Sequence, residues 1–212
     1  MAEPRIVLLG GSFDPPHDGH LAIAQTALAA GYDQVIFLPV ALSPHKLARP
    51  PAPAMDRYTM CVLATLDEPR FIVSRHELEK PPPSYSADTA RHFRCERPEA
   101  KIWWAIGADN LDALLTWLRV DDFVKDARFL VVPRGDLEGQ MLHEKVAGLP
   151  AWLSASMDIL AMPPVDVSST EIRRFIREGE VDRTRVPRVV SRYITRYGLY
   201  YETSVWQTEY GE

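Results

Sequence analysis

Two histidines three residues apart, His17 and His20, follow a pair of glycines near the start of the chain. An apolar run ends at those glycines, Gly10 and Gly11, and an alanine-rich segment over 21–30 follows the histidines. This order predicts a strand, a glycine turn and a helix start, a junction at which backbone N–H groups and the helix dipole attract phosphate. Because residues three apart share one face of a helix, both imidazoles are expected to face the anion that the turn holds.

A second helix start of the same kind is predicted near residue 168. Ser168 and Glu171 have the spacing of a capping box, in which a hydroxyl and a carboxylate satisfy exposed N–H groups. Helical side chains lean toward the N-terminus, so the guanidinium of Arg173 can reach an anion placed there. With the hydroxyl of Ser169, these groups would form a cradle for anionic oxygens.

Short apolar runs alternate with helix-forming segments along most of the chain. We expect strands over 6–9, 35–38, 71–74, 101–106, 129–132 and 159–162. We expect helices over 21–30, 54–66, 87–94, 109–118, 137–147 and 186–200, besides the one that opens at residue 168. The first strand, helix and strand imply a parallel pair with a right-handed crossover. The predicted fold is therefore α/β, with a doubly wound, mostly parallel, Rossmann-like sheet and helices on both faces.

Some helix details follow from single residues. Arg57 is expected to begin the polar face of the helix over 54–66. Ser84 or Ser86 is expected to cap the helix over 87–94, and Asp109 the helix over 109–118, because short polar side chains satisfy the first N–H groups.

The 212 residues suit one α/β domain over 1–200, whose C-terminal helical part spans about 168–200, and leave 201–212 unassigned. A formal charge of −5 provides no general attraction to nucleic acid or to an anionic membrane, so phosphate binding must depend on local basic groups. No apolar run approaches the roughly 20 residues of a membrane span. We expect a cytoplasmic protein without a signal peptide. A homo-oligomer is compatible with the sequence.

The two cysteines, Cys61 and Cys95, lie far apart and lack a spacing typical of metal ligands. We expect reduced thiols in or near the core. The pair of histidines at 17 and 20 has no third ligand in its own segment, so a structural zinc site is not expected there.

Other polar residues lie where predicted strands end, at the edge of the sheet that carries active sites in open α/β folds. Lys46 follows the second strand on a proline-rich loop, Gly107 and Asp109 follow the fourth strand, and Arg134 follows the fifth. Taken alone, Lys46 favours a solvated lysine on a loop, and Asp109 favours a plain helix cap.

Two stretches resemble signatures of the nucleotidylyltransferase superfamily. They are Gly10-Gly11-Ser12-Phe13-Asp14-Pro15 followed by His17-x-Gly19-His20, and Val167-Ser168-Ser169-Thr170-Glu171-Ile172-Arg173. From residue 6 to about residue 200, the chain is most similar to bacterial nicotinate-nucleotide adenylyltransferases. The resemblance implies an enzyme that joins ATP and nicotinate mononucleotide, with Mg²⁺ bound to the ATP phosphates and with no nucleic-acid or membrane partner.

The resemblance also implies roles for individual residues. The catalytic residues would be His17, His20, Lys46 and Arg173, with His20 at the α-phosphate. ATP would be bound by Gly10, Gly11, Ser12, Phe13, Gly107, Asp109, Arg134, Ser168 and Ser169. The nicotinate ring would be bound by Tyr85, Ser86 and Trp117, although a capping Ser86, a packed Tyr85 and a core Trp117 remain alternatives.

Other functions share parts of this pattern. The same adenylyl transfer could use nicotinamide mononucleotide or phosphopantetheine as acceptor, although the pantetheine enzymes are shorter and usually have threonine at the position of His17. Class I aminoacyl-tRNA synthetases also contain a His-x-Gly-His motif, but this chain lacks their lysine-rich motif and is too short for tRNA-reading domains. A non-catalytic nucleotide sensor could dispense with His20 or Arg173, and this chain has both.

Overall fold

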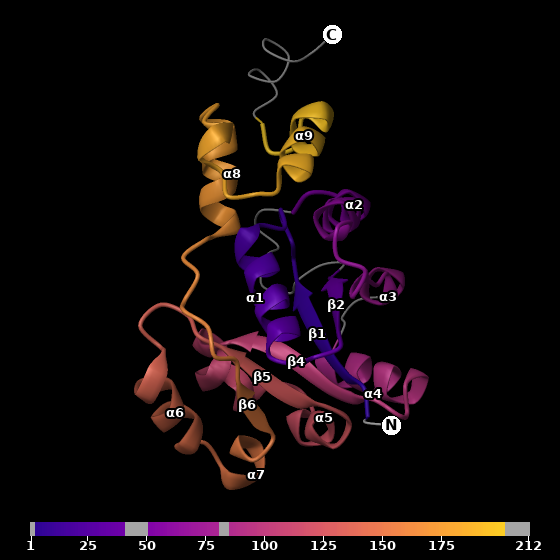
Figure 1. The fold of residues 1–212 in the computed structure, drawn as a ribbon, viewed down its shortest axis with the longest axis vertical. Coiled ribbons are helices and arrows are strands. Elements are labelled where there is room, and N and C mark those ends of the chain that lie inside the picture. Colours follow the sequence, from indigo (N-terminus) through magenta and orange to yellow (C-terminus); the bar gives the residue numbers. More distant parts are fainter. Residues whose placement is uncertain (1–2, 41–50, 81–84, 202–212) are drawn as a thin grey trace.

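The structure is a computed structural model, and its described residues are 3–40, 51–80 and 85–201. Figure 1 shows a single twisted sheet with helices packed around it. Six strands, all parallel, form the sheet in the order β3-β2-β1-β4-β5-β6. Their bounds are β1 Arg5–Gly11, β2 Gln34–Pro39, β3 Phe71–Val73, β4 Lys101–Gly107, β5 Arg128–Val132 and β6 Met157–Ile159.

The helices connect the strands and then continue beyond the sheet. The α-helices are α1 Asp18–Ala29, α2 Ala54–Thr65, α3 His76–Glu79, α4 Ser86–Glu96, α5 Val120–Asp126, α6 Gly139–Ala147, α7 Ala151–Ser154, α8 Ser169–Arg177 and α9 Arg188–Tyr197. The 3₁₀ segments are η1 Ala108–Thr116 and η2 Val181–Arg183. Within the described part of the chain, no helix combines the length and the apolarity that crossing a membrane requires.

The strand order places a change of direction between β1 and β4. From β1 the chain moves outward to β2 and β3, and it then returns to β4 beside β1 and moves outward to β5 and β6. In doubly wound sheets a crevice opens at the carboxyl ends of the two strands where the direction changes. The expected fold class is confirmed, and the site is expected between the ends of β1 and β4.

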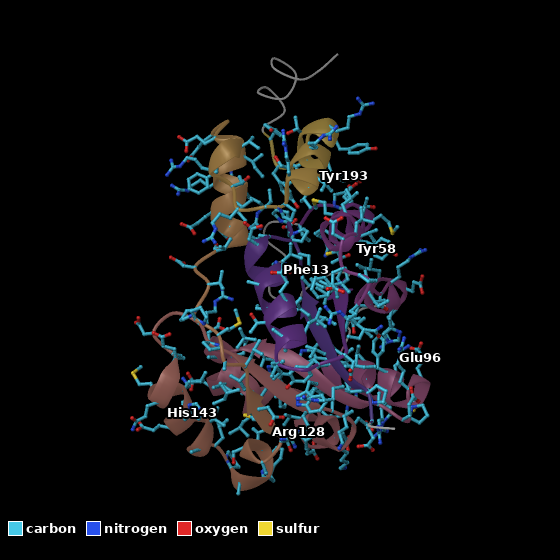
Figure 2. The ribbon with its side chains drawn as sticks, in the orientation of Figure 1. Phe13, Tyr58, Glu96, Arg128, His143 and Tyr193 are labelled. Carbon is cyan, nitrogen blue, oxygen red and sulfur yellow. The ribbon has the colours of Figure 1, made fainter. Side chains whose placement is uncertain are left out.

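Alternate residues of β1 show that the sheet is covered on both faces. Ile6 and Leu8 pack in one buried layer with α4 and α5. Val7 and Leu9 pack in the other with α1 and α2, a layer that also contains Phe13 (Figure 2). Burial on both faces explains why the strands are continuous apolar runs rather than alternating ones.

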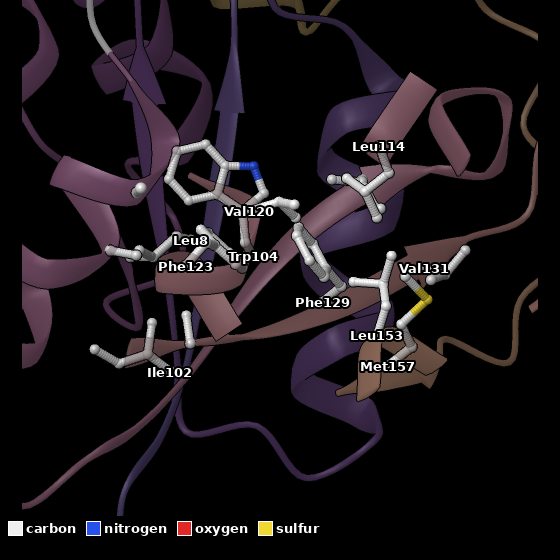
Figure 3. Packing of buried hydrophobic residues seen from close by; sticks show 14 of the residues in the cluster. Leu8, Ile102, Trp104, Leu114, Val120, Phe123, Phe129, Val131, Leu153 and Met157 are labelled. Carbon is white, nitrogen blue, oxygen red and sulfur yellow. The ribbon is translucent and has the colours of Figure 1, made fainter. Parts of the chain in front are cut away.

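An aromatic group lies at the centre of the first layer (Figure 3). The rings of Phe123 and Phe129 stack with centroids 4.3 Å apart. Trp104 meets Phe123 edge-on at 6.0 Å, and Trp117 meets Phe129 edge-on at 6.1 Å. The two tryptophans are therefore held by a stacked pair of buried phenyl rings.

A third apolar cluster lies outside the sheet. It joins Met60 of α2 to Ile172 and Ile176 of α8 and to Val190 and Ile194 of α9. Figure 1 shows these last two helices beyond the carboxyl end of the sheet, next to α1 and α2. Two helices from late in the chain are thus packed against α2 and next to α1.

Two predicted elements have different bounds or form. The sixth strand begins at Met157, two residues before the predicted run. Asp158 interrupts the apolar pattern by which a strand is predicted. Its carboxylate is tolerated on this edge strand because it accepts hydrogen bonds from Trp103 Nε1 at 2.6 Å and Arg128 Nε at 2.8 Å. The helix predicted after β4 is the 3₁₀ segment η1, preceded by Gly107. Asp109 lies inside its first turn and does not cap it, so that prediction is wrong.

The prediction that Arg57 begins a polar helix face is also wrong. Arg57 is buried, with 1 % of its surface exposed. Nε donates to the carbonyl of Ala52 at 2.9 Å, and Nη1 donates to the carbonyl of Ser12 at 2.6 Å. Burial lowers the pKa of this guanidinium, and the carboxylate of Asp14 opposes that effect. The carbonyl of Ser12 in the distant β1–α1 loop and that of Ala52 just before α2 make the burial tolerable, and periodicity within α2 does not reveal them.

Two smaller expectations are corrected. The residue that precedes α4 is Tyr85, and Ser86 is the first residue of the helix, so Ser86 is not its cap; Ser84 lies outside the described residues. Both cysteines are free thiols, but only Cys61 is in the core, whereas Cys95 is exposed on α4. Burial raises the pKa of the Cys61 thiol, which is consistent with an inert packed side chain.

Candidate active site

A cavity of about 420 Å³ opens at the carboxyl edge of the sheet. Its size is in the range of small-molecule sites. The β1–α1 junction contributes Gly10, Ser12, Phe13, His17 and His20 to its lining. This is the crevice that the reversal of strand order predicts, and the first signature of the sequence lies along it.

Residues from the other half of the sheet and from α8 complete the lining. Gly107 ends β4, Arg134 follows β5, and Trp117 follows η1. Ser168 and Ser169 line the cavity at the start of α8. Ten of the sixteen predicted site residues therefore surround one space, although they come from segments more than 150 positions apart in the sequence.

The remaining predicted residues lie elsewhere or are not described. Lys46 lies outside the described residues. Gly11, Tyr85, Ser86, Asp109 and Arg173 are not among the described residues that line the cavity.

The two histidines lie against each other at the N-terminus of α1. Their rings stack with centroids 3.8 Å apart and planes 25° from parallel. The backbone N–H of His17 donates to Nδ1 of His20 at 3.2 Å. Since Nδ1 of a neutral His20 is the acceptor, its proton is assigned to Nε2, which becomes the donor of the ring.

Burial keeps both imidazoles uncharged near neutral pH. It lowers the pKa of His17 to about 4, with a further contribution from the positive charge of Arg134. Burial also lowers the pKa of His20 well below its usual value, and the neighbouring His17 and Arg134 act in the same direction. His17 Nδ1 is buried and has no hydrogen-bond partner among the described residues. A buried nitrogen of this kind is available to a ligand.

At two glycines of the first signature, an added Cβ would crowd a neighbouring side chain. A Cβ at Gly10 would lie 2.9 Å from Cζ2 of Trp104. A Cβ at Gly19 would lie 3.0 Å from Nδ1 of His17. Sequence reasoning assigned the first-turn glycines to close approach of the backbone to oxygens. The structure adds a second reason, since Gly10 makes room for an indole that lines the same cavity.

The second helix start is docked directly on the first. Ser169 Oγ donates to the carbonyl of Pro15 at 3.1 Å. Arg173 Nη1 donates to the carbonyl of Asp14 at 2.6 Å and lies 3.3 Å from Oδ2 of the same residue. Ser168 is the N-cap of α8, as predicted, and its Oγ accepts from the backbone N–H of Glu171 at 3.4 Å. The N-termini of α1 and α8 therefore border one space, where their dipoles reinforce each other toward an anion.

Of the three residues predicted to bind nicotinate, Trp117 lines the cavity, and Tyr85 and Ser86 do not. Trp117 lines the cavity and is half-buried against Phe129. Tyr85 is 37 % exposed, and the guanidinium carbon of Arg119 lies 5.8 Å from the centre of its ring. Arg119 also pairs with Asp88 at 2.7 Å.

Asp109 and Arg134 interact with each other at the end of β4 and β5. Oδ2 of Asp109 lies 3.7 Å from Nε of Arg134, and Oδ1 accepts from the side chain of Asn110 at 3.2 Å. Asn110 itself lines the cavity. The pair thus lies at the cavity's edge and leaves Arg134 as a cation that borders it.

Three residues that line the cavity or bond to its signature segments were missed as candidates. Asp14 belongs to the first signature and is a buried hydrogen-bond centre. Trp104 lines the cavity from within β4, where an apolar run conceals it. Tyr200 reaches Asp14 from the far end of the chain, and no signal in the sequence indicates that contact.

Comparison with known proteins agrees with this geometry. Residues 8–175 match the model of the cytidylyltransferase-like family. A Thermus thermophilus protein described as "probable nicotinate-nucleotide adenylyltransferase" is 43 % identical over 197 residues, which cover 92 % of this chain and 99 % of the relative. A Neisseria meningitidis serogroup B protein of the same description is 40 % identical over 202 residues, covering 92 % and 98 %. The chain belongs to the nicotinate-nucleotide adenylyltransferase family.

A solved structure of the same class supports the fold. Plasmodium falciparum nicotinic acid mononucleotide adenylyltransferase complexed with NaAD superposes with a TM-score of 0.74 at 16 % identity, covering 93 % of this chain and 97 % of that one. At this identity the match supports the fold alone. The family-model match ends at residue 175, before α9 and Tyr200.

Proposed function

We propose that this protein transfers the adenylyl group of ATP to nicotinate mononucleotide, forming nicotinate adenine dinucleotide and pyrophosphate. One observation carries the proposal. Two helix N-termini from opposite ends of the chain, one bringing paired imidazoles and the other serine hydroxyls, line a single cavity at the switch point of the sheet. A triphosphate needs two such anion sites in line, and membership of the adenylyltransferase family supplies the acceptor.

The chemistry requires positioning more than proton transfer. An oxygen of the mononucleotide phosphate attacks the α-phosphorus of ATP, and the bond from that phosphorus to the bridging oxygen of the β-phosphate breaks. Pyrophosphate leaves with the electron pair. Because the nucleophile is already an anion, no strong general base is needed, and catalysis depends on alignment and charge stabilisation.

Each group of the site then has a role. His20, whose Nε2 is the donor, holds an α-phosphate oxygen as charge develops there. His17 and Lys46 hold ATP phosphates, while Ser169 and Arg173 hold the β and γ phosphates as pyrophosphate departs. Gly10, Gly11, Ser12, Phe13, Gly107 and Ser168 shape the nucleotide site.

Two groups are assigned to the bases and the sugar. Asp109 binds the ribose of ATP, and Arg134 lies near the adenine. Trp117 stacks on the pyridine ring, with Tyr85 and Ser86 at its carboxylate.

We infer that Mg²⁺ enters with ATP rather than as a resident metal. Among the described residues, no group of three His, Cys, Asp or Glu side chains is arranged to hold a metal ion. Mg²⁺ usually keeps several waters and binds phosphate oxygens, so the nucleotide can supply its ligands. When bound, the ion neutralises part of the charge of the leaving pyrophosphate.

A product assay tests the proposal. Purified protein is incubated with ATP, Mg²⁺ and, in separate reactions, nicotinate mononucleotide, nicotinamide mononucleotide or phosphopantetheine, and dinucleotide and pyrophosphate are measured. We expect both products with the nicotinate acceptor, and no pyrophosphate release without an acceptor. A higher kcat/KM for the amide would overturn the choice of acceptor. ATP binding without any product would indicate a nucleotide sensor.

A further inference from the structure

Asp14 is a buried centre at which three parts of the chain meet. Its residue surface is 4 % exposed. Oδ1 accepts from the hydroxyl of Tyr200 at 2.8 Å and from the backbone N–H of Ala52 at 3.0 Å. Oδ2 faces Nη1 of Arg173 at 3.3 Å. The carboxylate thus joins the end of the chain, the segment before α2 and the first turns of α8.

The position of Tyr200 is unusual for its residue type. Its φ is +71°, a left-handed conformation that side chains other than glycine rarely adopt. It follows Gly198, which ends α9 at φ +61°. Such a conformation persists where surrounding contacts determine it, and it concentrates at functional positions. The contact that the turn secures here is the hydroxyl bond to Asp14.

Burial and the nearby carboxylate raise the pKa of the Tyr200 hydroxyl. It therefore remains protonated and donates to Asp14 throughout the physiological range. With Oδ1 occupied by two donors, rotation of the Asp14 carboxylate is restricted, and Oδ2 stays directed at Arg173. Arg173 Nη1 therefore contacts Asp14 twice, through the ion pair with Oδ2 and through the hydrogen bond that it donates to the backbone carbonyl. Linked bonds of this kind orient charged groups more firmly than single ones.

We propose that Tyr200 is a positioning residue for the triphosphate site: its hydroxyl fixes Asp14, and Asp14 fixes the guanidinium of Arg173 that receives the β and γ phosphates. This inference rests on the proposed function for the role of Arg173. It assigns a purpose to a segment beyond the residues matched by the family model. The chain end then contributes to ATP recognition without touching ATP.

The chain offers a matched control for the test. Tyr193 of α9 donates its hydroxyl to Oδ1 of Asp56 of α2 at 2.7 Å, so a second tyrosine near the end of the described chain makes the same type of bond to an aspartate outside the site. Asp56 lies on α2 and is not among the described residues that line the cavity. Tyr200→Phe and Tyr193→Phe each remove one hydroxyl while retaining the ring.

The experiment compares the binding of ATP and AMP to wild type and to both variants by isothermal titration calorimetry. AMP lacks the β and γ phosphates. For Tyr200→Phe we expect the Kd of ATP to rise about tenfold, as for loss of one hydrogen bond to a charged group, while that of AMP is unchanged. For Tyr193→Phe we expect both constants to equal those of wild type. Thermal unfolding of all three proteins shows whether folding is comparable.

Several outcomes would overturn the proposal. They are an unchanged Kd of ATP in Tyr200→Phe, equal losses for ATP and AMP, or equal losses in the two variants. A double-mutant cycle adds a second test, because Tyr200→Phe should cause no further loss of ATP affinity in an Asp14→Asn background. Turnover of wild type is measured separately, so that an inactive protein whose ATP affinity still depends on Tyr200 would contradict the proposed function and not this inference.

Discussion

Nδ1 of His20 accepts a hydrogen bond from the backbone of His17 at 3.2 Å, while the two rings stack 3.8 Å apart. One histidine thereby sets the tautomer of the other. The helix start that attracts the anion also determines which nitrogen of His20 carries the proton. Burial holds both groups uncharged near pH 7, so each ring has one N–H donor and one acceptor nitrogen.

The first prediction concerns His20→Ala. We expect kcat to fall on the order of 10²–10³-fold, a typical loss for one transition-state donor, with little change in the free energy of unfolding. Steady-state kinetics with ATP and nicotinate mononucleotide measures it. His143→Ala is the control, since His143 is exposed on α6, away from the site (Figure 2). Unchanged turnover in His20→Ala would remove His20 from the catalytic set.

The second prediction concerns stability at acid pH. The pKa of His17 is about 4 in the folded protein and near 6.5 in the unfolded chain. Folding also lowers the pKa values of His20 and His76. Between these values the unfolded chain binds more protons, so the free energy of unfolding should fall as pH falls from about 6.5 to about 4.

Urea denaturation across that pH range measures this dependence. A His17→Asn variant should show a shallower slope, because one proton-binding group is removed. An identical slope in the variant and wild type would contradict the assignment of a depressed pKa to His17.

The third prediction concerns Gly10→Ala. Its Cβ would lie 2.9 Å from the indole of Trp104, so we expect a loss of about 1–3 kcal/mol and lower activity. Trp104→Phe in the same chain should recover part of the loss by removing the clashing ring. Gly148→Ala serves as control, because its nearest neighbours lie at 3.5 Å. Thermal unfolding measures all of them, and equal effects at the two glycines would contradict the steric argument.

The fourth prediction concerns Arg57→Met. Removing the guanidinium leaves the carbonyls of Ser12 and Ala52 without this donor and Asp14 with one cation fewer nearby. We expect a loss of about 3 kcal/mol, in the range for breaking a buried charge network. Arg70→Met removes an exposed ion pair with Glu68 and should have a much smaller effect. Similar losses in the two variants, measured by chemical denaturation, would disprove the special status of Arg57.

Local patterns predicted much of this fold. The buried strands, the helix starts at 17–20 and 168–171 and the convergence of residues at one sheet edge follow from apolar runs, caps and strand order. Asp158 shows where that reasoning fails, because a polar residue on an edge strand interrupts the apolar pattern. Arg57 shows a second failure, since its burial depends in part on the carbonyl of Ser12, 45 residues away. Long-range contacts of this kind leave no periodic signal.

The candidate site was predicted unevenly for the same reason. Residues in the two signatures gather around the cavity because each signature is itself a local structure. Trp104 was missed because one face of a buried strand resembles the other in sequence. Tyr200 was missed because its partner is 186 residues away. The roles of all sixteen predicted site residues stay predictions.

The packing of α8 and α9 on α2 has a consequence for the behaviour of the whole molecule. A nucleotide held between the starts of α1 and α8 would bridge an early helix and a late helix of the chain. Opening of the C-terminal helices would then require release of the ligand. Saturating ATP should therefore slow amide hydrogen exchange in residues 169–197 and protect that region from proteolytic cleavage.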